Sequence, residues 1–180
     1  VVASMWVWGA IDIEYLSGHG FNVPSDLKTD IEGLSMKEVA AYFKHRFNIA
    51  DDLDTIVGVW NDMAIEKYSH AIKLKPHVDE FIKYAYEKGI KIGLFTSNSL
   101  VLAEAALKAH DIYKYFGAIT AGCTDIKGKP DPQGYLVTAE KLSVDPERCL
   151  VFEDLVKGIQ AGINAGMKTC AVKDAYSEYQ

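Results

Sequence analysis

The sequence predicts an α/β protein in which a parallel sheet follows an all-helical region. Two observations lead to this prediction. In the first seventy-odd residues apolar side chains recur at helical spacing, and in the remainder short apolar runs alternate with helical segments. Alternating strands and helices are typical of a parallel sheet covered by helices. We therefore expect a helical cap over residues 1–74 and an α/β core over residues 75–180.

Three amphipathic helices are expected in the cap. The first runs from about Met5 to Leu16. The second follows Ser35-Met36-Lys37-Glu38, a capping box in which the serine and glutamate satisfy free N–H groups at the helix start. An apolar face from Leu53 to Ala71 predicts a third, longer helix. Residues 18–33, with Pro24 and several Asp, Ser and Thr residues, are expected to form a loop.

In the core, two apolar runs end in polar side chains. The run from Ile90 to Phe95 precedes Thr96-Ser97-Asn98-Ser99, and helical spacing begins at Leu100. Exposed N–H groups and the positive end of the dipole favour an anion at such a helix start. Ordinary capping of the helix by Asn98 or Ser99 is the alternative, and it needs no ligand. Further strands are expected near residues 118–120 and 169–172.

The second run, from Cys149 to Phe152, ends in the adjacent carboxylates of Glu153 and Asp154. Neighbouring carboxylates repel each other, and Mg²⁺ relieves this repulsion because it prefers oxygen ligands. A turn on the surface after a strand is the alternative interpretation. The pair therefore predicts a cation site at the end of a buried strand.

The loop Gly128-Lys129-Pro130-Asp131-Pro132 presents a lysine on a stiffened backbone. Its two prolines restrict the backbone and so limit where Lys129 can point, which suits a fixed positive charge for a phosphoryl group. A solvated lysine in a proline-rich turn is the alternative. The loop is not a Walker A loop, because Pro130 stands where Ser or Thr is required.

Composition excludes several classes of function. The net charge is −6, the pI is about 5.3, and the sequence has no dense Lys/Arg block, which argues against nucleic acid or an anionic membrane as the main partner. Three cysteines without CxxC spacing indicate free thiols in a reducing compartment, so we expect a cytoplasmic protein. No apolar run approaches the length of a membrane span and no signal peptide is visible. We expect a monomer.

In chain order the core segments supply a hydroxyl, an ammonium and paired carboxylates on successive βα connections. This order resembles the haloacid dehalogenase-like hydrolase superfamily, in particular the phosphatases and phosphomutases related to β-phosphoglucomutase and phosphoglycolate phosphatase. Thr96 matches the second motif, Lys129-Pro130 the third and Glu153-Asp154 the fourth. Leu74-Lys75-Pro76 resembles the start of the core, and residues 158–167 resemble the helix after the fourth motif. The resemblance implies a Rossmann-like parallel sheet with an inserted helical cap.

One departure from the superfamily is large. Its first motif is a strand that ends in Asp-x-Asp-Gly-Thr, and no such segment occurs in these 180 residues. Val1 to Trp6 resemble the residues that follow that motif. A strand at the centre of a sheet contributes about 8–15 kcal/mol, so we expect an incomplete chain rather than an evolved loss. We also expect the C-terminal end of the core to be lacking. As given, the chain is expected to have no phosphatase activity.

The resemblance implies a Mg²⁺-dependent phosphatase that acts on a small phosphorylated metabolite such as a sugar phosphate. In the superfamily the first aspartate of the missing motif forms an aspartyl-phosphate, which water then hydrolyses. Asp154 would hold Mg²⁺, with Glu153 assisting directly or through water. Lys129 and Thr96 would stabilise charge on the phosphoryl oxygens. The implied phosphate-binding residues are Thr96, Ser97, Asn98 and Lys129.

Two other functions remain open. Phosphomutases of the β-phosphoglucomutase type carry a cap histidine and a cap arginine at the positions of Trp8 and Met36, so these two residues count against a mutase. A non-catalytic phosphate- or metal-binding module, either a fragment or a pseudoenzyme, is the third possibility. In relatives the missing strand lies between the strands that end at Phe95 and Phe152. We therefore expect no direct pairing of those strands and a separation of about 9–10 Å.

Overall fold

The computed structural model describes residues 1–4, 6–31, 36–121 and 126–174. Two compact units make up the chain, one of Ser4–Lys67 and the other of Val1–Ala3 with Tyr68–Gln180. The boundary expected from sequence, after residue 74, falls seven residues later than this division (74 against 67). Among the described helices none has both the length and the apolar character needed to cross a bilayer.

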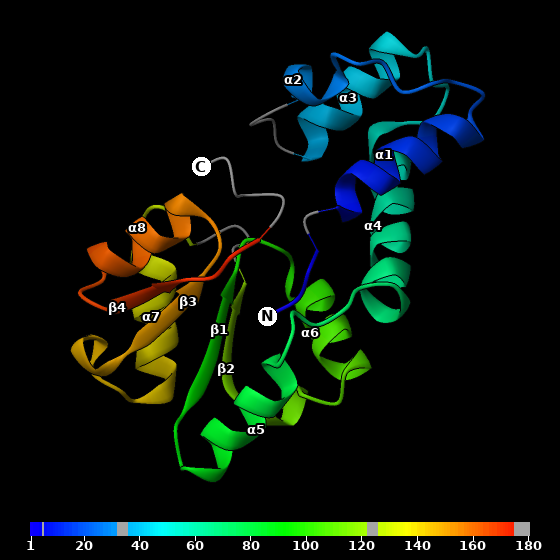
Figure 1. The fold of residues 1–180 in the computed structure, drawn as a ribbon. Coiled ribbons are helices and arrows are strands. Elements are labelled where there is room, and N and C mark those ends of the chain that lie inside the picture. Colours follow the sequence, from blue (N-terminus) through cyan, green and yellow to red (C-terminus); the bar gives the residue numbers. More distant parts are fainter. Residues whose placement is uncertain (5, 32–35, 122–125, 175–180) are drawn as a thin grey trace. The chain divides into compact units, whose positions relative to one another are not determined.

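The Ser4–Lys67 unit is helical, as expected. Its aromatic core includes Tyr15, Phe43 and Trp60, with the Trp60 ring edge-on at 5.5 Å from Tyr15 and 5.0 Å from Phe43. Ser35 of the expected capping box lies outside the described residues. The helices are α1 (Val7–Gly18), α2 (Leu27–Ile31), α3 (Met36–Arg46) and α4 (Leu53–His70), the last of which ends beyond the unit boundary (Figure 1).

The short helix α2 corrects the prediction of an uninterrupted loop over residues 18–33. It is only five residues long, too short to show a helical period in the sequence. Leu27 is buried, and Arg46 on α3 forms ion pairs at 2.8 Å with Asp26 and Asp30. Tertiary contacts therefore hold a segment whose own sequence predicts a loop.

In the other unit the strands form two parallel pairs. β1 (Ile92–Thr96) pairs with β2 (Phe116–Ala121), and β3 (Leu150–Glu153) pairs with β4 (Lys168–Ala171). Within the described ranges no ladder joins β1 to β3, which confirms the expectation that these strands do not pair directly. The expected 9–10 Å separation remains a prediction. The helices of this unit are α5 (Val78–Glu87), α6 (Leu100–Ala109), α7 (Gln133–Leu142) and α8 (Val156–Asn164), with short 3₁₀ turns at Tyr113–Tyr115 and Pro146–Arg148.

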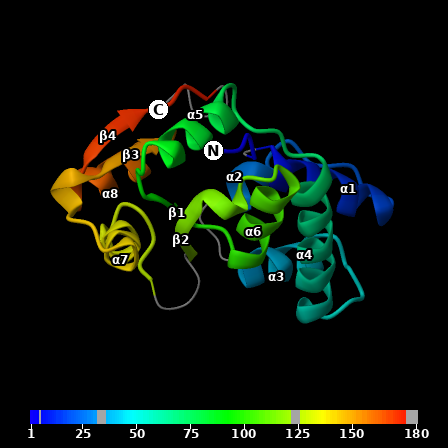
Figure 2. The same ribbon diagram turned by 90° about the horizontal axis from the view of Figure 1, so that it is seen from below.

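Helices cover both faces of the β1–β2 pair (Figure 2). Because successive side chains of a strand point to opposite faces, Ile92 and Leu94 pack near Ile82 of α5, whereas Phe95 packs against Tyr135 of α7. β3 was expected to be buried, but it is buried on one face only. Val151 and Glu153 are buried, while Leu150 and Phe152 are about half-exposed.

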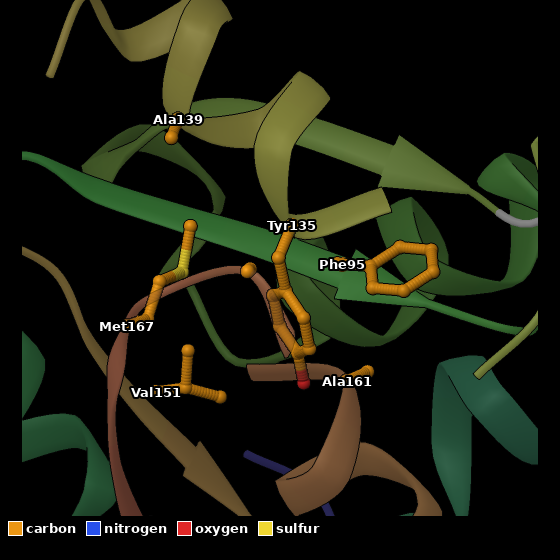
Figure 3. Close-up of a cluster of buried hydrophobic side chains, with 7 residues drawn as sticks. Phe95, Tyr135, Ala139, Val151, Ala161 and Met167 are labelled. Carbon is orange, nitrogen blue, oxygen red and sulfur yellow. The ribbon is translucent and has the colours of Figure 1, made fainter. Parts of the chain in front are cut away.

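One apolar cluster joins the two strand pairs (Figure 3). Phe95 of β1, Tyr135 of α7, Val151 of β3 and Met167, which precedes β4, turn toward one another in this cluster. The cluster therefore places the carboxyl ends of β1 and β3 beside a shared core. These are the strand ends that carry Thr96 and the Glu153-Asp154 pair.

Asp12 on α1 is a source of instability that a substitution can remove. Burial raises the pKa of its carboxyl to about 6, so the charged form is penalised in the folded state. The penalty is full above about pH 6 and disappears below about pH 4, where the carboxyl is protonated in both states. Asp12→Asn should therefore stabilise the chain at pH 7 by about 1–2 kcal/mol, after allowance for solvent screening, and have little effect at pH 4.

Guanidinium unfolding monitored by tryptophan fluorescence tests this prediction, because all three tryptophans lie in the Ser4–Lys67 unit. Asp62→Asn, at an exposed position on α4, is the matched control and should change stability at neither pH. Equal stability of Asp12→Asn and the wild type at pH 7 would contradict the proposed cost of the Asp12 charge.

Candidate active site

The Glu153 carboxylate is the centre of a buried polar cluster at the end of β3. Lys129 Nζ donates to its Oε1, which also accepts from the Tyr135 hydroxyl at 2.9 Å. The backbone N–H groups of Asp154 and Leu155 point to Oε2, at 3.1 and 3.4 Å. Both oxygens of Glu153 are therefore engaged within the protein, and the carboxylate orients Lys129.

Lys129 lies between the ends of β1 and β3. Its Nζ is 5.2 Å from the ring centroid of Phe95 on β1 and 5.6 Å from that of Tyr135. The Lys129 and Glu153 side chains are 13% and 8% exposed, so water screens the pair little. Two aromatic faces and one carboxylate fix the position of this ammonium. It is not the solvated lysine of the alternative interpretation.

Burial alone would raise the pKa of the Glu153 carboxyl, but the Lys129 ammonium and the Tyr135 hydroxyl outweigh burial and hold this pKa below its usual value. Burial, together with the neighbouring Glu153 carboxylate, raises the pKa of Tyr135. At neutral pH the cluster therefore contains an ionised Glu153 and a neutral Tyr135 that can donate its proton.

Helix α8 passes so close to Glu153 that only glycine fits at position 158. A Cβ atom there would lie 2.3–2.6 Å from the three carboxyl atoms of Glu153. Gly158→Ala should therefore displace the carboxylate and destabilise the chain by about 1–3 kcal/mol, despite alanine's higher helix propensity. Thermal unfolding followed by circular dichroism measures the effect.

Gly58→Ala provides the matched control for this substitution. Gly58 lies exposed within α4, and a Cβ atom there would meet nothing within 4 Å. This substitution should stabilise the chain by about 0.5–1 kcal/mol. A stabilising effect of Gly158→Ala would contradict the close approach of α8 to Glu153.

Asp154 contacts a second lysine that sequence reasoning did not select. Its Oδ2 lies 3.2 Å from Lys75 Nζ, and the same ammonium donates a short hydrogen bond to Asp174. Burial would lower the pKa of Lys75, but its bonds to Asp174 and Asp154 raise it. Leu74-Lys75-Pro76 was noted only as the start of the core, and no local pattern links Lys75 to carboxylates 79 and 99 residues later.

The Thr96 cluster begins the connection from β1 to α6. Thr96 Oγ1 accepts from the backbone N–H of Asn98 at 3.1 Å, and Asn98 Nδ2 donates to the Tyr68 hydroxyl at 2.8 Å. Ser99 caps α6, because its Oγ accepts from the N–H of Leu102 at 3.4 Å. Ser97 is exposed. Capping thus accounts for Ser99, and the Thr96 hydroxyl keeps its proton to donate.

The structure brings together some of the predicted site residues. Lys129 and Glu153 are in contact, and Asp154 follows Glu153 at the same strand end. Thr96 follows Phe95, whose ring lies beside Lys129. The roles assigned to Thr96, Ser97, Asn98, Lys129, Glu153 and Asp154 remain predictions. Tyr135, Lys75 and Asp174 are additional polar residues of this region that sequence reasoning missed.

The carboxylates differ in how well they suit a divalent cation. Glu153 has little free capacity, because four donors point at its two oxygens. Asp154 and Asp174 both turn an oxygen toward one cation, the Lys75 ammonium, and such hard oxygens are the ligands that Mg²⁺ prefers. In the described part of the chain no group of three or more His, Cys, Asp or Glu side chains is arranged to hold a metal. Asp154 therefore has the donor chemistry for a metal-anchoring role, and that role remains a prediction.

Comparison with known proteins shows the family of the chain. Residues 9–166 match the family of haloacid dehalogenase-like hydrolases. The chain belongs to this family. A phosphorylated carbohydrates phosphatase of Thermotoga maritima is 31% identical over 150 residues, which cover 83% of this chain and 69% of that protein. Hexitol phosphatase B of Escherichia coli is 34% identical over 109 residues, which cover 61% of this chain and 49% of that protein.

Solved structures of haloacid dehalogenase-like proteins have the same fold. CbbY from Rhodobacter sphaeroides, in complex with phosphate, superimposes with a TM-score of 0.82 over 100% of this chain and 84% of that one, at 21% identity. This likeness confirms the predicted α/β fold with parallel strands and helices. It is evidence for the fold alone, because identity is low.

Proposed function

We propose that this chain carries the phosphate- and metal-binding part of a Mg²⁺-dependent phosphatase that acts on a small phosphorylated carbohydrate. The observation that supports this best is the Lys129–Glu153 pair, a buried ammonium held at the ends of β1 and β3. Family membership supports hydrolase chemistry. The substrate class follows the phosphorylated carbohydrates phosphatase of Thermotoga maritima.

Each site residue has a role in the proposed reaction. Lys129 neutralises charge that develops on the phosphoryl oxygens, and Glu153 and Tyr135 hold it in place. The Thr96 hydroxyl donates to the same oxygens, with support from Ser97 and Asn98. Such fixed donors and charges supply most of the rate enhancement in phosphoryl transfer, because they need no reorganisation during the reaction.

Two parts of the proposed mechanism, the metal ion and the nucleophile, are not among the contacts that the structure describes. Mg²⁺ would be held by Asp154, with Glu153 in contact through water, and would neutralise negative charge on the phosphate. The nucleophile would be the first aspartate of an Asp-x-Asp-Gly-Thr segment, a motif that these 180 residues do not contain. That aspartate would accept the phosphoryl group, and water would then release phosphate.

The expected setting of the protein is a cytoplasmic monomer. Cys149 and Cys170 are free thiols in the structure. Cys123 lies outside the described residues.

The decisive experiment compares two polypeptides. The first is the 180-residue chain, and the second, called the extended chain below, carries an apolar strand ending in Asp-x-Asp-Gly-Thr ahead of Val1. With p-nitrophenyl phosphate and Mg²⁺ the 180-residue chain should show no turnover, and the extended chain should turn over at about 1 s⁻¹ or faster. Turnover at that rate by the 180-residue chain would refute the prediction that this chain lacks its nucleophile. An inactive but folded extended chain would favour a non-catalytic phosphate- or metal-binding module.

A further inference from the structure

A pocket lies at the amino ends of β1 and β2, at the opposite end of these strands from the candidate active site. Its volume is about 600 Å³, which is within the range of pockets that hold small-molecule ligands. The end of α5, the starts of β1 and β2 and the end of α7 form its walls, and all of them belong to one unit (Figure 1). Lys91 at the pocket and Thr96 at the candidate active site are roughly 16 Å apart at the usual rise of a strand.

Positive charge gathers in this pocket. Among the described residues that line it, Lys91, Lys114 and Lys141 are lysines and none is acidic. Lys91 Nζ donates to the backbone carbonyl of the last residue of α7 at 2.7 Å, and Lys141 Nζ donates to a carbonyl of β2 at 3.3 Å. A carbonyl orients an ammonium without cancelling its charge, whereas Lys114 pairs at 2.7 Å with Asp111, which is not in the lining. The pocket is therefore positive although the chain carries a net charge of −6.

Aromatic and apolar side chains form the rest of the wall. Tyr86 and Ile90 are 55% and 57% exposed, and the Tyr115 ring lies 5.1 Å from that of Tyr86 at an angle of 61°. Large apolar side chains that gather at a hollow surface are typical of a binding site. A small inorganic anion would leave this wall uncovered, a neutral ring would leave the ammonium groups unpaired, and a cation would be repelled. The lining therefore matches an aromatic ring that carries a negative charge.

We propose that this pocket binds a small aromatic anion, a ring system that carries a carboxylate, sulfonate or phosphate group. The anionic group pairs with Lys91 and Lys141, and the ring packs against Tyr86 and Tyr115. This inference goes beyond the proposed phosphatase function and does not depend on it, because no residue of the candidate active site lines the pocket. The strand expected ahead of Val1 would lie on the β3 side of β1, away from β2, so the extended chain should keep the pocket.

Three probes that share one ring system test the proposal at pH 7.5 without Mg²⁺. Naphthalene-2-sulfonate, 2-naphthylmethanol and 2-naphthylmethylammonium differ in charge but hardly in size, and a phosphatase cannot cleave the sulfonate. The sulfonate should bind the 180-residue chain about tenfold more tightly than the alcohol, less so at high salt, and the ammonium should not bind. The extended chain should bind the sulfonate with the same affinity. Equal affinity for sulfonate and alcohol, or loss of sulfonate binding in the extended chain, would overturn the proposal.

NMR titration of chain labelled with ¹⁵N-glycine shows where the sulfonate binds. Gly89 and Gly117 line the pocket, Gly158 lies beside Glu153 and Gly9 lies on α1. The sulfonate should shift the Gly89 and Gly117 signals saturably and leave those of Gly158 and Gly9 in place. Saturable shifts of Gly158 without shifts of Gly89 and Gly117 would place the anion beside Lys129 and would refute the proposed site.

Substitution of Lys91 separates charge recognition from ring packing. Lys91→Gln can still donate to the carbonyl of α7, but it should lower sulfonate affinity about fivefold and leave alcohol affinity unchanged. Lys91→Arg should keep the preference for the sulfonate, and Tyr86→Ala should weaken both probes. Lys157→Gln, at an exposed position on α8 outside the lining, should behave as wild type. Undiminished sulfonate binding by Lys91→Gln would contradict the proposal, and the wild-type titrations decide it even if a variant fails to fold.

Discussion

Replacing Lys129 by alanine is expected to lower the kcat of the extended chain at least a hundredfold. The ammonium is a positive charge fixed before the reaction begins, and removal of one preorganised charge-stabilising group costs about 10²–10³ in kcat. The substitution should also destabilise the 180-residue chain by about 3 kcal/mol, because it leaves Glu153 charged, buried and without its cation. Steady-state kinetics and guanidinium unfolding measure the two effects separately.

Lys127→Ala is the matched control for this loop. Lys127 lies two residues earlier, its side chain is 77% exposed, and its ion pair with Asp131 is 3.7 Å long. An exposed pair of this kind contributes little, so its loss should change stability by less than about 0.5 kcal/mol and leave kcat unchanged. If the two lysine variants had the same kcat, Lys129 would have no special role in the reaction.

The stability effect of Lys129→Ala should also depend on pH. The pKa of Glu153 is held below its usual value in the folded state, so the pair stabilises the fold above the ordinary glutamate pKa. This contribution is lost as pH falls through the folded-state pKa, because protonated Glu153 no longer attracts Lys129. The difference in unfolding free energy between wild type and Lys129→Ala should therefore be largest near pH 7 and shrink below about pH 4.

Sequence periodicity predicted much of the fold because the pattern is local. Apolar runs that end in polar clusters predicted β1 and β3. Apolar residues at helical spacing predicted the longer helices. The five-residue helix α2 was missed because ion pairs between distant residues, such as Arg46 and Asp30, hold it. The half-exposed face of β3 was missed for a related reason. Burial of Leu150 and Phe152 depends on what packs against that face, which an apolar sequence does not specify.

The residues of the candidate site were selected one by one from the sequence, but the contacts among them were not predicted. Lys129 and Glu153 were both selected, and separate roles were assigned to them, for phosphate and for metal. Their contact spans 24 residues and exists because the loop before α7 passes the end of β3. Tyr135 lies in the first turn of α7, and its position six residues after Lys129 gives no sign of the hydroxyl that donates to Glu153. Contacts of this kind can be identified only from the tertiary structure, because no local sequence pattern indicates them.

Replacing Asp154 by alanine in the extended chain is expected to abolish Mg²⁺-dependent turnover. In the proposed mechanism this carboxylate anchors the metal, because both oxygens of Glu153 already accept hydrogen bonds within the protein. Calorimetry should show that Asp154→Ala loses Mg²⁺ binding, and circular dichroism should show that it stays folded. Asp145→Ala, at an exposed position before β3, should retain both Mg²⁺ binding and activity.

Lys75 allows metal anchoring to be distinguished from a purely structural role of Asp154. If Asp154 served only to hold the Lys75 ammonium, Lys75→Met would lose as much activity as Asp154→Ala. We expect the opposite, because Lys75 occupies the space between two carboxylates that a divalent cation would also favour. Lys75→Met should therefore keep kcat within tenfold of the parent and bind Mg²⁺ more tightly. Weaker Mg²⁺ binding by Lys75→Met would mean that the ammonium orients Asp154 for the metal rather than competing with it.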